Sequence, residues 1–371
     1  MYNKSGRVDV PLFAAALGCC VIGLLLAASM QYIGAGQDIT SGSVEGLFKT
    51  HAAAMLAGGV LCALLTVIGS GTLERYAPYF LGAGLLLTAV TFTPFGYAPA
   101  GSDDRAWIDL GFVTLQPSEI LKLCFIVSFA AHIRSLGEEL NKPLNLLLLA
   151  LHAAVPTGLV WAQGDQGTAV IFIAAAVGML IAGGLDVRLL LGTLLALPVI
   201  GWGAWSFLLR EHQKQRLAVL LDPSLDPLGA GYQQLRAREA IAGVGWFGSG
   251  LFSRERDLVR VSQAQNDFIF SYAAQTGGFA LCAVITLLLF FIVIRMTVLS
   301  NRAEGSGKII CAGAAAMLFA HTFINISMVL GFMPVIGVPL PFISAGGTAV
   351  MTMLAAVGLV QGCIPERRRE A

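Results

Sequence analysis

The sequence predicts an all-α integral membrane protein with about ten transmembrane helices and one large extracytoplasmic loop. The first observation behind this is composition: of 371 residues, 56% are hydrophobic and 12% are charged, about half the charged share of a soluble domain. The second is a mean hydropathy of +0.77. The third is a series of apolar runs, each about 20 residues long, the length that crosses a bilayer. A lipid-embedded chain can leave such apolar surface uncovered.

The expected spans follow one another along the whole chain, so we expect a single domain over residues 1–371. They are 10–34, 49–70, 78–97, 117–134, 143–162, 168–184, 188–209, 267–295, 308–331 and 345–363. The first run is longer than the apolar region of a cleavable signal peptide, which favours a membrane span. An even number of spans places both termini on the same side.

Basic residues in short loops predict which side that is, because such loops stay in the cytoplasm. The short loops and tails that alternate spans place together contain Lys4, Arg7, Arg75, Arg134, Lys142, Arg188, Arg295, Arg302, Lys308, Arg367, Arg368 and Arg369. We therefore expect both termini in the cytoplasm and loop 210–266 outside. That loop is itself basic, through Arg210, Lys214, Arg216, Arg236, Arg238, Arg254, Arg256 and Arg260. Its charges suit an anionic substrate at the membrane surface, or they pair with acidic residues of the same loop.

Several function classes are disfavoured. The net charge of +1 gives no basic field for nucleic acid. The seven cysteines lie in or beside apolar runs without a CxxC pair, which is typical of packing residues. The glycine-rich stretch Gly243–Gly250 lacks the Gly-Lys-Ser/Thr of a phosphate-binding loop, so ATP hydrolysis is not expected.

Ionisable residues at membrane depth are costly and often functional. Pro117 suits the first turn of a helix, and Glu119 in that turn is favoured by the helix dipole. Lys122 lies one turn deeper on the same face. The pair either borders a polar cavity or forms a structural ion pair.

Two aspartates stand where helices are expected to begin. Asp165 and Asp267 can each cap a helix, and each can instead present a carboxylate at the membrane surface. Three prolines interrupt segment 333–347, and irregular backbone at membrane depth needs protein or a cavity around it. On the preceding span, His321 and Asn325 share one face, as an interhelical hydrogen-bonding pair or as part of a site.

Six stretches together resemble one known family. They are Arg105–Gly111 with Gln116–Lys122, Gly164–Thr168, His212–Arg216, Leu221–Gln233, Asn266–Phe270 and Gly337–Gly347. In order and spacing they resemble the RodA/FtsW/SpoVE family, also called SEDS proteins. The first hundred residues match in hydropathy alone.

The resemblance implies a peptidoglycan glycosyltransferase in the bacterial cytoplasmic (inner) membrane. Such enzymes polymerise lipid II, an undecaprenyl-pyrophosphate-linked disaccharide, at the outer face of the membrane and work with a class B penicillin-binding protein. Asp267 matches the family's essential aspartate, which makes it the expected catalytic residue. The expected substrate-binding residues are Arg105, Trp107, Glu119, Lys122, Asp165, His212, Lys214, Arg216 and Ser344.

This chain departs from the family pattern in places. The family often has Leu-Pro-Glu, two variable residues and Thr-Asp before the eighth span, whereas segment 261–267 here has neither that Pro nor that Glu. The Gln-Ser that usually follows the Gly-Tyr motif is replaced by segment 235–238, and Ala345 replaces an aromatic residue. Any role of the missing glutamate cannot be carried over.

The chemistry matches the residue types. A sugar hydroxyl must lose a proton while it attacks an anomeric carbon, and general-base help is worth about 10²–10⁴ in rate. The pyrophosphate leaving group calls for cations, and Lys122 and the basic loop are candidates. Asp267 is expected to act as the base or to hold an activating divalent cation, Mg²⁺ or Mn²⁺.

A lipid II flippase and a non-catalytic scaffold are the alternative functions. Many transporters contain inverted repeats, and none is evident here. The retained Asp267 argues against a scaffold.

Overall fold

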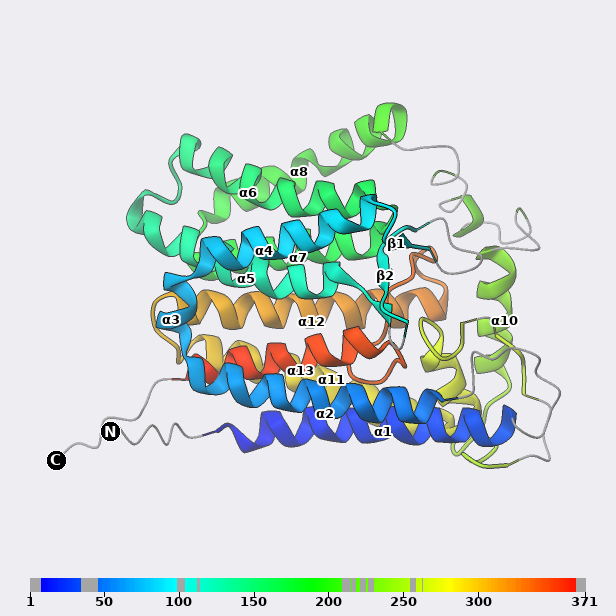
Figure 1. Cartoon of the computed structure of the whole chain (residues 1–371). Helices are drawn as coiled ribbons and strands as arrows, with labels where there is room; N and C mark the ends of the chain where they lie inside the picture. Colours follow the sequence, from blue (N-terminus) through cyan, green and yellow to red (C-terminus); the bar gives the residue numbers. More distant parts are fainter. Residues whose placement is uncertain are drawn as a thin grey trace.

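In a computed structural model of the protein, all ten expected spans are helices, and they lie side by side in one bundle (Figure 1). The structure describes residues 8–34, 46–98, 104–111, 114–208, 214, 218–220, 225, 230–253, 258–261 and 263–364. The spanning helices are α1 (Val10–Gly34), α2 (Leu47–Ile68), α4 (Ala77–Ala89), α5 (Pro117–Leu136), α6 (Pro143–Ala162), α7 (Gln166–Gly183), α8 (Val187–Gly203), α11 (Ile269–Ser300), α12 (Ser306–Leu330) and α13 (Gly347–Gly362).

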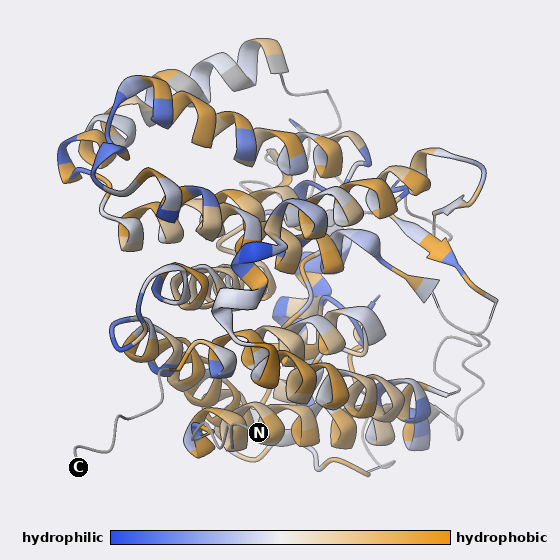
Figure 2. Cartoon of the chain, turned by 60° about the vertical axis from the view of Figure 1, so that its left-hand side comes forward, coloured by the Kyte–Doolittle hydropathy of each residue, from blue (hydrophilic) through white to orange (hydrophobic). Residues whose placement is uncertain are grey.

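Most of these helices are long and apolar enough to cross a membrane. Within the described residues seven meet that criterion, α4 and α13 are shorter apolar helices, and α8, with 17 residues, falls in neither group. Apolar residues line the helices, and hydrophilic ones are concentrated at their ends and in loops (Figure 2). Helix α4 continues only as the 3-10 turn η1 (Val90–Phe92), so the expected span 78–97 was too long. Helix α8 continues as the π-helical turn η3 (Ala204–Leu208).

The start of α1 and the end of α13 meet at one end of the bundle, as an even span count requires. The amide of Asp9 donates to Oε1 of Gln361 at 2.8 Å, and Nε2 of Gln361 donates back to the carbonyl of Asp9 at 3.0 Å. Arg295 of α11 pairs with the Asp9 carboxylate at 2.6 Å. The short helix α3 (Ser70–Arg75) lies at the same end, where Glu74 contacts Arg134. We call this the Asp9 end; it carries those basic residues used to predict the cytoplasmic side that the structure describes, namely Arg75, Arg134, Lys142, Arg188, Arg295, Arg302 and Lys308.

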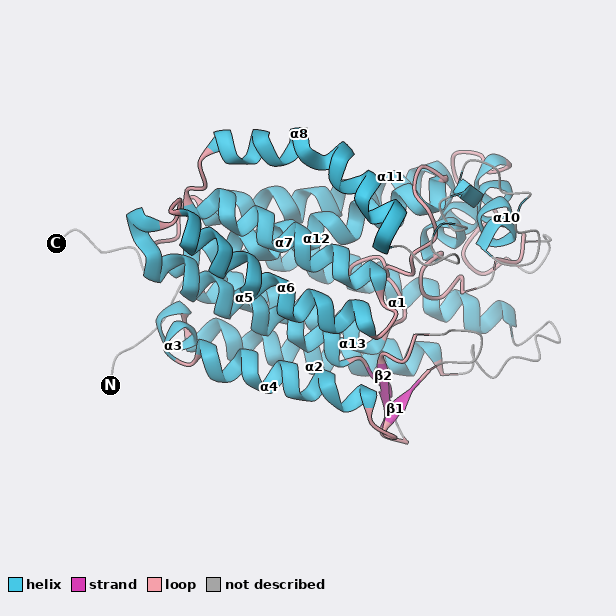
Figure 3. Ribbon diagram, turned by 90° about the horizontal axis from the view of Figure 1, so that it is seen from above, coloured by secondary structure: helices cyan, strands magenta, loops and turns pink. Residues whose placement is uncertain are grey.

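The opposite end, here called the Asp267 end, carries a small antiparallel sheet of order β1-β2-β3. Its strands are β1 (Gly96–Tyr97), β2 (Trp107–Asp109) and β3 (Thr114–Leu115), and Ile108 pairs with Gly96 on one side and Leu115 on the other. The expectation of an all-α chain was therefore incomplete, because strands of two or three residues are too short to show a period of two. Helix α10 (Ala230–Ala242), from the long loop, lies at this end as well (Figure 3).

Helix α12 is the centre of the bundle. It packs against α5, α7, α11 and α13, and 72% of its most apolar 18-residue stretch is buried. Helix α8 is the opposite case, since it packs mainly on its own continuation η3 and lies along the edge of the bundle (Figure 3). The seven cysteines are free, and six of them are buried, which confirms their packing role.

The glycine-rich stretch near residue 245 has a structural use. Helix α11 is kinked at Gly278, where φ is 65° and ψ is −165°. The kink exposes backbone groups that the loop pairs with: the amides of Phe279 and Ala280 donate to the carbonyls of Gly245 and Trp246 at 3.2 and 3.0 Å. The long loop is thereby docked onto α11 near the Asp267 end.

Candidate active site

A buried chain of polar side chains crosses from α5 to α12. Nζ of Lys122 lies 2.8 Å from Oε1 of Glu119 and 2.8 Å from Nε2 of His321. Nδ1 of His321 lies 3.3 Å from the carbonyl of Pro339. Because ammonium only donates, Nε2 accepts and Nδ1 carries the hydrogen that Pro339 accepts. Of the two sequence interpretations of Glu119 and Lys122, the structure shows the ion pair, and His321 of α12 joins it.

This pair is fully enclosed. The side chains of Lys122 and Glu119 are 2% and 1% exposed. Oε2 of Glu119 is buried and has no partner among the described residues. The ammonium of Lys122 thus lies between an anion, Glu119, and an imidazole, His321.

Asp165 caps helix α7, as one of its two sequence interpretations predicts. Its Oδ1 accepts from the amide of Thr168 at 2.8 Å, and its Oδ2 accepts from Nε2 of Gln116 at 3.0 Å. Gln116 is the N-cap residue of α5, so Asp165 joins the starts of two helices. Burial raises the pKa of Asp165 to about 6, against the opposing effects of the Thr168 hydrogen bonds and of Lys122.

Asp267 does not cap a helix. The N-cap residue of α11 is Phe268, and no side chain caps that helix. Asp267 as a whole residue is half-buried, and none of the described residues forms a hydrogen bond or ion pair with its carboxylate. The capping alternative for Asp267 is therefore wrong, and its carboxylate is available for chemistry.

The backbone around Asp267 is held firmly even though its side chain is not. Nδ2 of Asn325 donates to the carbonyls of Asp267 and Val338, each at 2.7 Å. The hydroxyl of Ser344 donates to the carbonyl of Asn266 at 2.7 Å, and the amide of Ala345 donates to the carbonyl of Gln265 at 2.8 Å. Three consecutive carbonyls, 265–267, are thus fixed by α12 and by the proline-rich segment; we call this set of hydrogen bonds the 265–267 clamp.

Backbone strain is concentrated in the same two segments. Of the described residues, two that are not glycine have positive φ, Gln263 at 55° and Phe342 at 64°. Such conformations cost of order 1–3 kcal/mol each and persist where the surroundings impose them, often at functional sites. Both lie within a few residues of the 265–267 clamp, which supports a functional role for this region.

Electrostatics tune Asp267 to neutral pH. Burial raises the pKa of Asp267, the negative charges of Asp165 and Asp104 act in the same direction, and together they bring it to about 7. A carboxylate with a pKa near the working pH can accept a proton and release it again, which is the requirement for a general base.

The remaining predicted site residues occupy different positions. Arg105 is exposed beside the sheet, with Nε donating to the carbonyl of Gly96 at 3.1 Å, and Trp107 lies half-buried in β2. Ser344 is buried, and its hydroxyl also accepts from the amide of Leu340 at 2.8 Å, so within the described residues its hydrogen bonds hold backbone. Lys214 is half-buried. His212 and Arg216 lie outside the described residues.

The structure also adds residues to the site that were not predicted as its members. Asn325 and His321 form its α12 side, and their spacing of four on one helical face was the sequence signal for them. Asp104 had no such signal, because its effect on Asp267 exists only in the folded chain. As for metals, no group of three or more His, Cys, Asp or Glu side chains in the described part of the chain is arranged to hold an ion.

The fold and the site define a polytopic membrane protein that carries, at one end of its helix bundle, an aspartate whose pKa is raised to about 7. The sequence model of the FtsW/RodA/SpoVE family, described as a cell cycle protein, matches residues 10–368, and the chain belongs to this family. It is 32% identical over 349 residues to peptidoglycan glycosyltransferase MrdB of Escherichia coli K12, covering 93% of this chain and 91% of the relative. It is 30% identical over 360 residues to the probable peptidoglycan glycosyltransferase FtsW of Geobacter sp. (strain M18), covering 92% and 96%.

Solved structures agree. One chain of a peptidoglycan synthase complex, described as coordinating polymerization and crosslinking, superposes with a TM-score of 0.78 and 26% identity over 96% of this chain and 97% of that one. The rod shape determining protein RodA of Thermus thermophilus has the same fold, with a TM-score of 0.70, 24% identity and 97% of each chain covered.

Proposed function

We propose that this protein is a peptidoglycan glycosyltransferase that polymerises lipid II into glycan strands at the outer face of the cytoplasmic membrane. The observation that carries the proposal is Asp267: its carboxylate has no capping partner, its pKa is raised to about 7, and its backbone is held by the 265–267 clamp. The names of the E. coli and Geobacter relatives support the same activity.

In the proposed reaction Asp267 accepts the proton of the acceptor sugar's 4-hydroxyl. The oxygen then bonds to the anomeric carbon of the donor as the bond to the pyrophosphate oxygen breaks. The leaving group departs as undecaprenyl pyrophosphate, already charged, so a protonating acid is less critical than in glycoside hydrolysis. One tuned carboxylate therefore suffices for the proton transfer, with a contribution of about 10²–10⁴ in rate.

The basic residues of the Asp267 end are the candidate contacts for the negatively charged pyrophosphate. Lys122 is enclosed by Glu119 and His321 and is not a direct ligand in this arrangement. Arg236 pairs with Glu239 at 2.6 Å, as the alternative interpretation of the loop charges predicts. Arg105 is exposed beside the sheet and is the proposed phosphate contact among the described residues. A divalent cation on Asp267 stays a prediction.

We further propose that the protein works with a class B penicillin-binding protein, which crosslinks the strands. The solved complex that this chain resembles is a peptidoglycan synthase complex described as coordinating both steps. The proposed location is the bacterial cytoplasmic membrane, multi-pass, with both termini in the cytoplasm.

Purified protein incubated with labelled lipid II in detergent tests the activity. Wild-type protein is expected to form glycan chains. The Asp267→Asn variant is the matched control and is expected to form none. Detergent abolishes the two sides of a membrane, so a flippase or a scaffold would give no chains. Unchanged lipid II with wild-type protein, at a purity and lipid composition that preserve folding, would reject the polymerase.

A further inference from the structure

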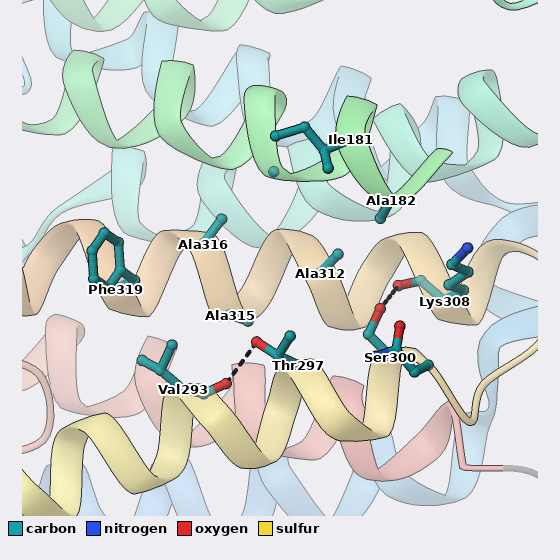
Figure 4. Close-up of a pocket in the computed structure, with 12 residues that line it drawn as sticks. Ile181, Ala182, Val293, Thr297, Ser300, Lys308, Ala312, Ala315, Ala316 and Phe319 are labelled. Carbon is teal, nitrogen blue, oxygen red and sulfur yellow. Dashed lines mark hydrogen bonds between the residues drawn. The ribbon is translucent and has the colours of Figure 1, made fainter. Parts of the chain in front are cut away.

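A groove lies between α7, α11 and α12 near the Asp9 end, far from the candidate active site (Figure 4). Its volume is about 450 Å³. It forms because α7 and α11 both pack along α12 but make little direct contact with each other. We call it the α7–α11 groove.

The floor of the groove is made of small residues. Ala312, Ala315 and Ala316 of α12 line it, and Gly178 of α7 faces them. A Cβ atom on Gly178 would lie 2.5 Å from that of Ala316, so the two helices meet there without room for a side chain. Phe319 stands at the inner end and is 43% exposed, so the groove opens to the surroundings of the bundle.

The other end of the groove is polar. Its hydroxyls are already committed, since Ser300 donates to the carbonyl of Lys308 at 2.7 Å and Thr297 donates to that of Val293 at 2.9 Å. The ammonium of Lys308 is exposed and has no hydrogen bond or ion pair within the described residues. Lys308 also lies in the first turn of α12, whose N-terminus has no side-chain cap. That N-terminus already has an anion beside it, because the hydroxyl of Ser306 donates to Oε2 of Glu74 at 2.6 Å. The exposed ammonium of Lys308 is therefore the group that favours a further anion at this end of the groove.

The length of the groove identifies the kind of anion. Figure 4 shows Lys308 at one end and Phe319 at the other, with Ala312 and Ala316 between them. Eleven helical residues separate the two ends, which is about 16 Å at 1.5 Å per residue. The hydrocarbon of one leaflet is about 15 Å deep, half of a bilayer core. A charged headgroup site and an apolar floor are therefore spaced as in one phospholipid.

We propose that the α7–α11 groove binds one anionic phospholipid of the leaflet at the Asp9 end, with its phosphate on Lys308 and an acyl chain on the alanine floor. Lipid tails are as apolar as the groove walls, so the walls provide shape and little preference. The contact between Lys308 and the headgroup sets which lipid binds. A chain held there fills the gap between α7 and α11 and braces both against α12.

Lipid titration of the purified protein by native mass spectrometry tests this. Phosphatidylglycerol is expected to bind about fivefold more tightly than phosphatidylethanolamine of the same chain length, the factor that one lysine at an anionic surface supplies. Lys308→Gln should abolish the preference. Lys142→Gln is the matched control, because Lys142 is 60% exposed and pairs with Glu139 outside the groove, so it should keep the preference.

A second pair of measurements separates a lipid from its headgroup. Ala312→Leu narrows the floor and should weaken both lipids, with thermal unfolding used to confirm that the variant folds. Millimolar glycerol 3-phosphate, which has the headgroup phosphate but no chains, should not displace phosphatidylglycerol. Displacement by that ion, equal binding of the two lipids, or an unchanged preference in Lys308→Gln would each overturn the proposal. If the groove instead binds a membrane helix of a partner protein, the two lipids should bind equally.

Discussion

At the scale of single residues, Asp267 is distinguished by what it lacks. Asp165 uses both carboxylate oxygens to cap α7 and to bind Gln116, whereas Asp267, also beside a helix start, caps nothing. The pKa values of both aspartates are raised, chiefly by burial. This difference in hydrogen bonding is the reason why Asp267, and not Asp165, is the proposed proton acceptor.

Asp267→Asn is expected to lower lipid II polymerisation by at least ~10², the low end of the general-base contribution, because an amide cannot accept the proton. Folding should persist, since Asp267 caps no helix. Burial favours the neutral carboxyl, with a folded pKa of about 7 against 3.8, so the wild type loses stability as pH rises through that interval. At pH 8 the variant should therefore unfold at a temperature no lower than wild type. Polymerisation within a few-fold of wild type would exclude Asp267 as the base.

The pH dependence of polymerisation should report the same carboxylate. Because the pKa of Asp267 is raised to about 7, the basic form is depleted below that value. We expect kcat/KM to rise with pH through an apparent pKa near 7 and to level off above it, measured on purified enzyme with saturating acceptor. A profile that is flat between pH 5.5 and 8, values on either side of about 7, would contradict a general base tuned by burial.

Lys122→Ala tests the buried ion pair. Removing one partner of such a pair leaves an unpaired buried charge and typically costs about 3–5 kcal/mol. We expect a large drop in the free energy of unfolding and lower polymerisation. Lys142→Ala is the matched control, because Lys142 and Glu139 form a pair of the same i,i+3 spacing but are 60% and 63% exposed. That variant should lose less than about 1 kcal/mol. Equal effects of the two variants would mean that burial of the Glu119–Lys122 pair is unimportant.

At the scale of elements, two irregular segments of backbone build the site. The 265–267 clamp joins the loop before α11 to α12 and to the proline-rich segment, so the position of Asp267 is set by elements far apart in the sequence. Nine residues after the start of α11, the kink at Gly278 receives the loop around Gly248. Irregular backbone is tolerated at this depth because protein groups satisfy it.

Gly278→Ala should disturb this docking. A Cβ atom at Gly278 would lie 2.4 Å from the amide nitrogen of Gly248 and 2.5 Å from the carbonyl oxygen of Trp246, and φ there is positive. We expect a loss of about 1–3 kcal/mol in unfolding free energy, from backbone strain and overpacking, with reduced polymerisation because the loop shifts. Gly59→Ala in α2 is the control, since nothing lies within 4 Å of its added Cβ. It should be neutral or stabilise by roughly 0.5–1 kcal/mol. If both variants behave alike, docking of the loop around Gly248 at the Gly278 kink is unimportant for stability and activity.

At the scale of the whole molecule, the bundle has two chemically different ends. The Asp9 end carries the described short-loop basic residues and the tied ends of α1 and α13. The Asp267 end carries the sheet, α10 and the candidate site. This polarity is the physical basis for placing the Asp9 end in the cytoplasm.

Cysteine labelling in intact cells tests that orientation. Ser224→Cys in loop 210–266 should react with a membrane-impermeant thiol reagent, whereas Glu138→Cys, exposed at the Asp9 end, should react only after lysis. The seven native cysteines give little background, since six are buried and Cys124 is half-buried. The reverse labelling pattern would invert the topology and place the candidate site in the cytoplasm.

The sequence by itself determined the spans, the even count and the candidate carboxylate. Apolar run length is fixed by bilayer thickness, so it can be read locally. The Asn266–Phe270 motif identified Asp267 without any contact being known. Where local signals were weak, the prediction was incomplete: the strands of the sheet were missed, and α4 was predicted too long.

Only the tertiary structure decided which aspartate is a cap and which is free. It also placed His321 against Lys122, 199 residues away, and Asn325 against the carbonyl of Asp267, 58 residues away. The pKa of Asp267 depends on burial and on the fields of Asp165 and Asp104, which reach it only when α7, α11 and the sheet are packed together. Hydropathy and motif spacing report what a segment does on its own, whereas hydrogen bonds and electrostatic fields between helices depend on how those helices pack.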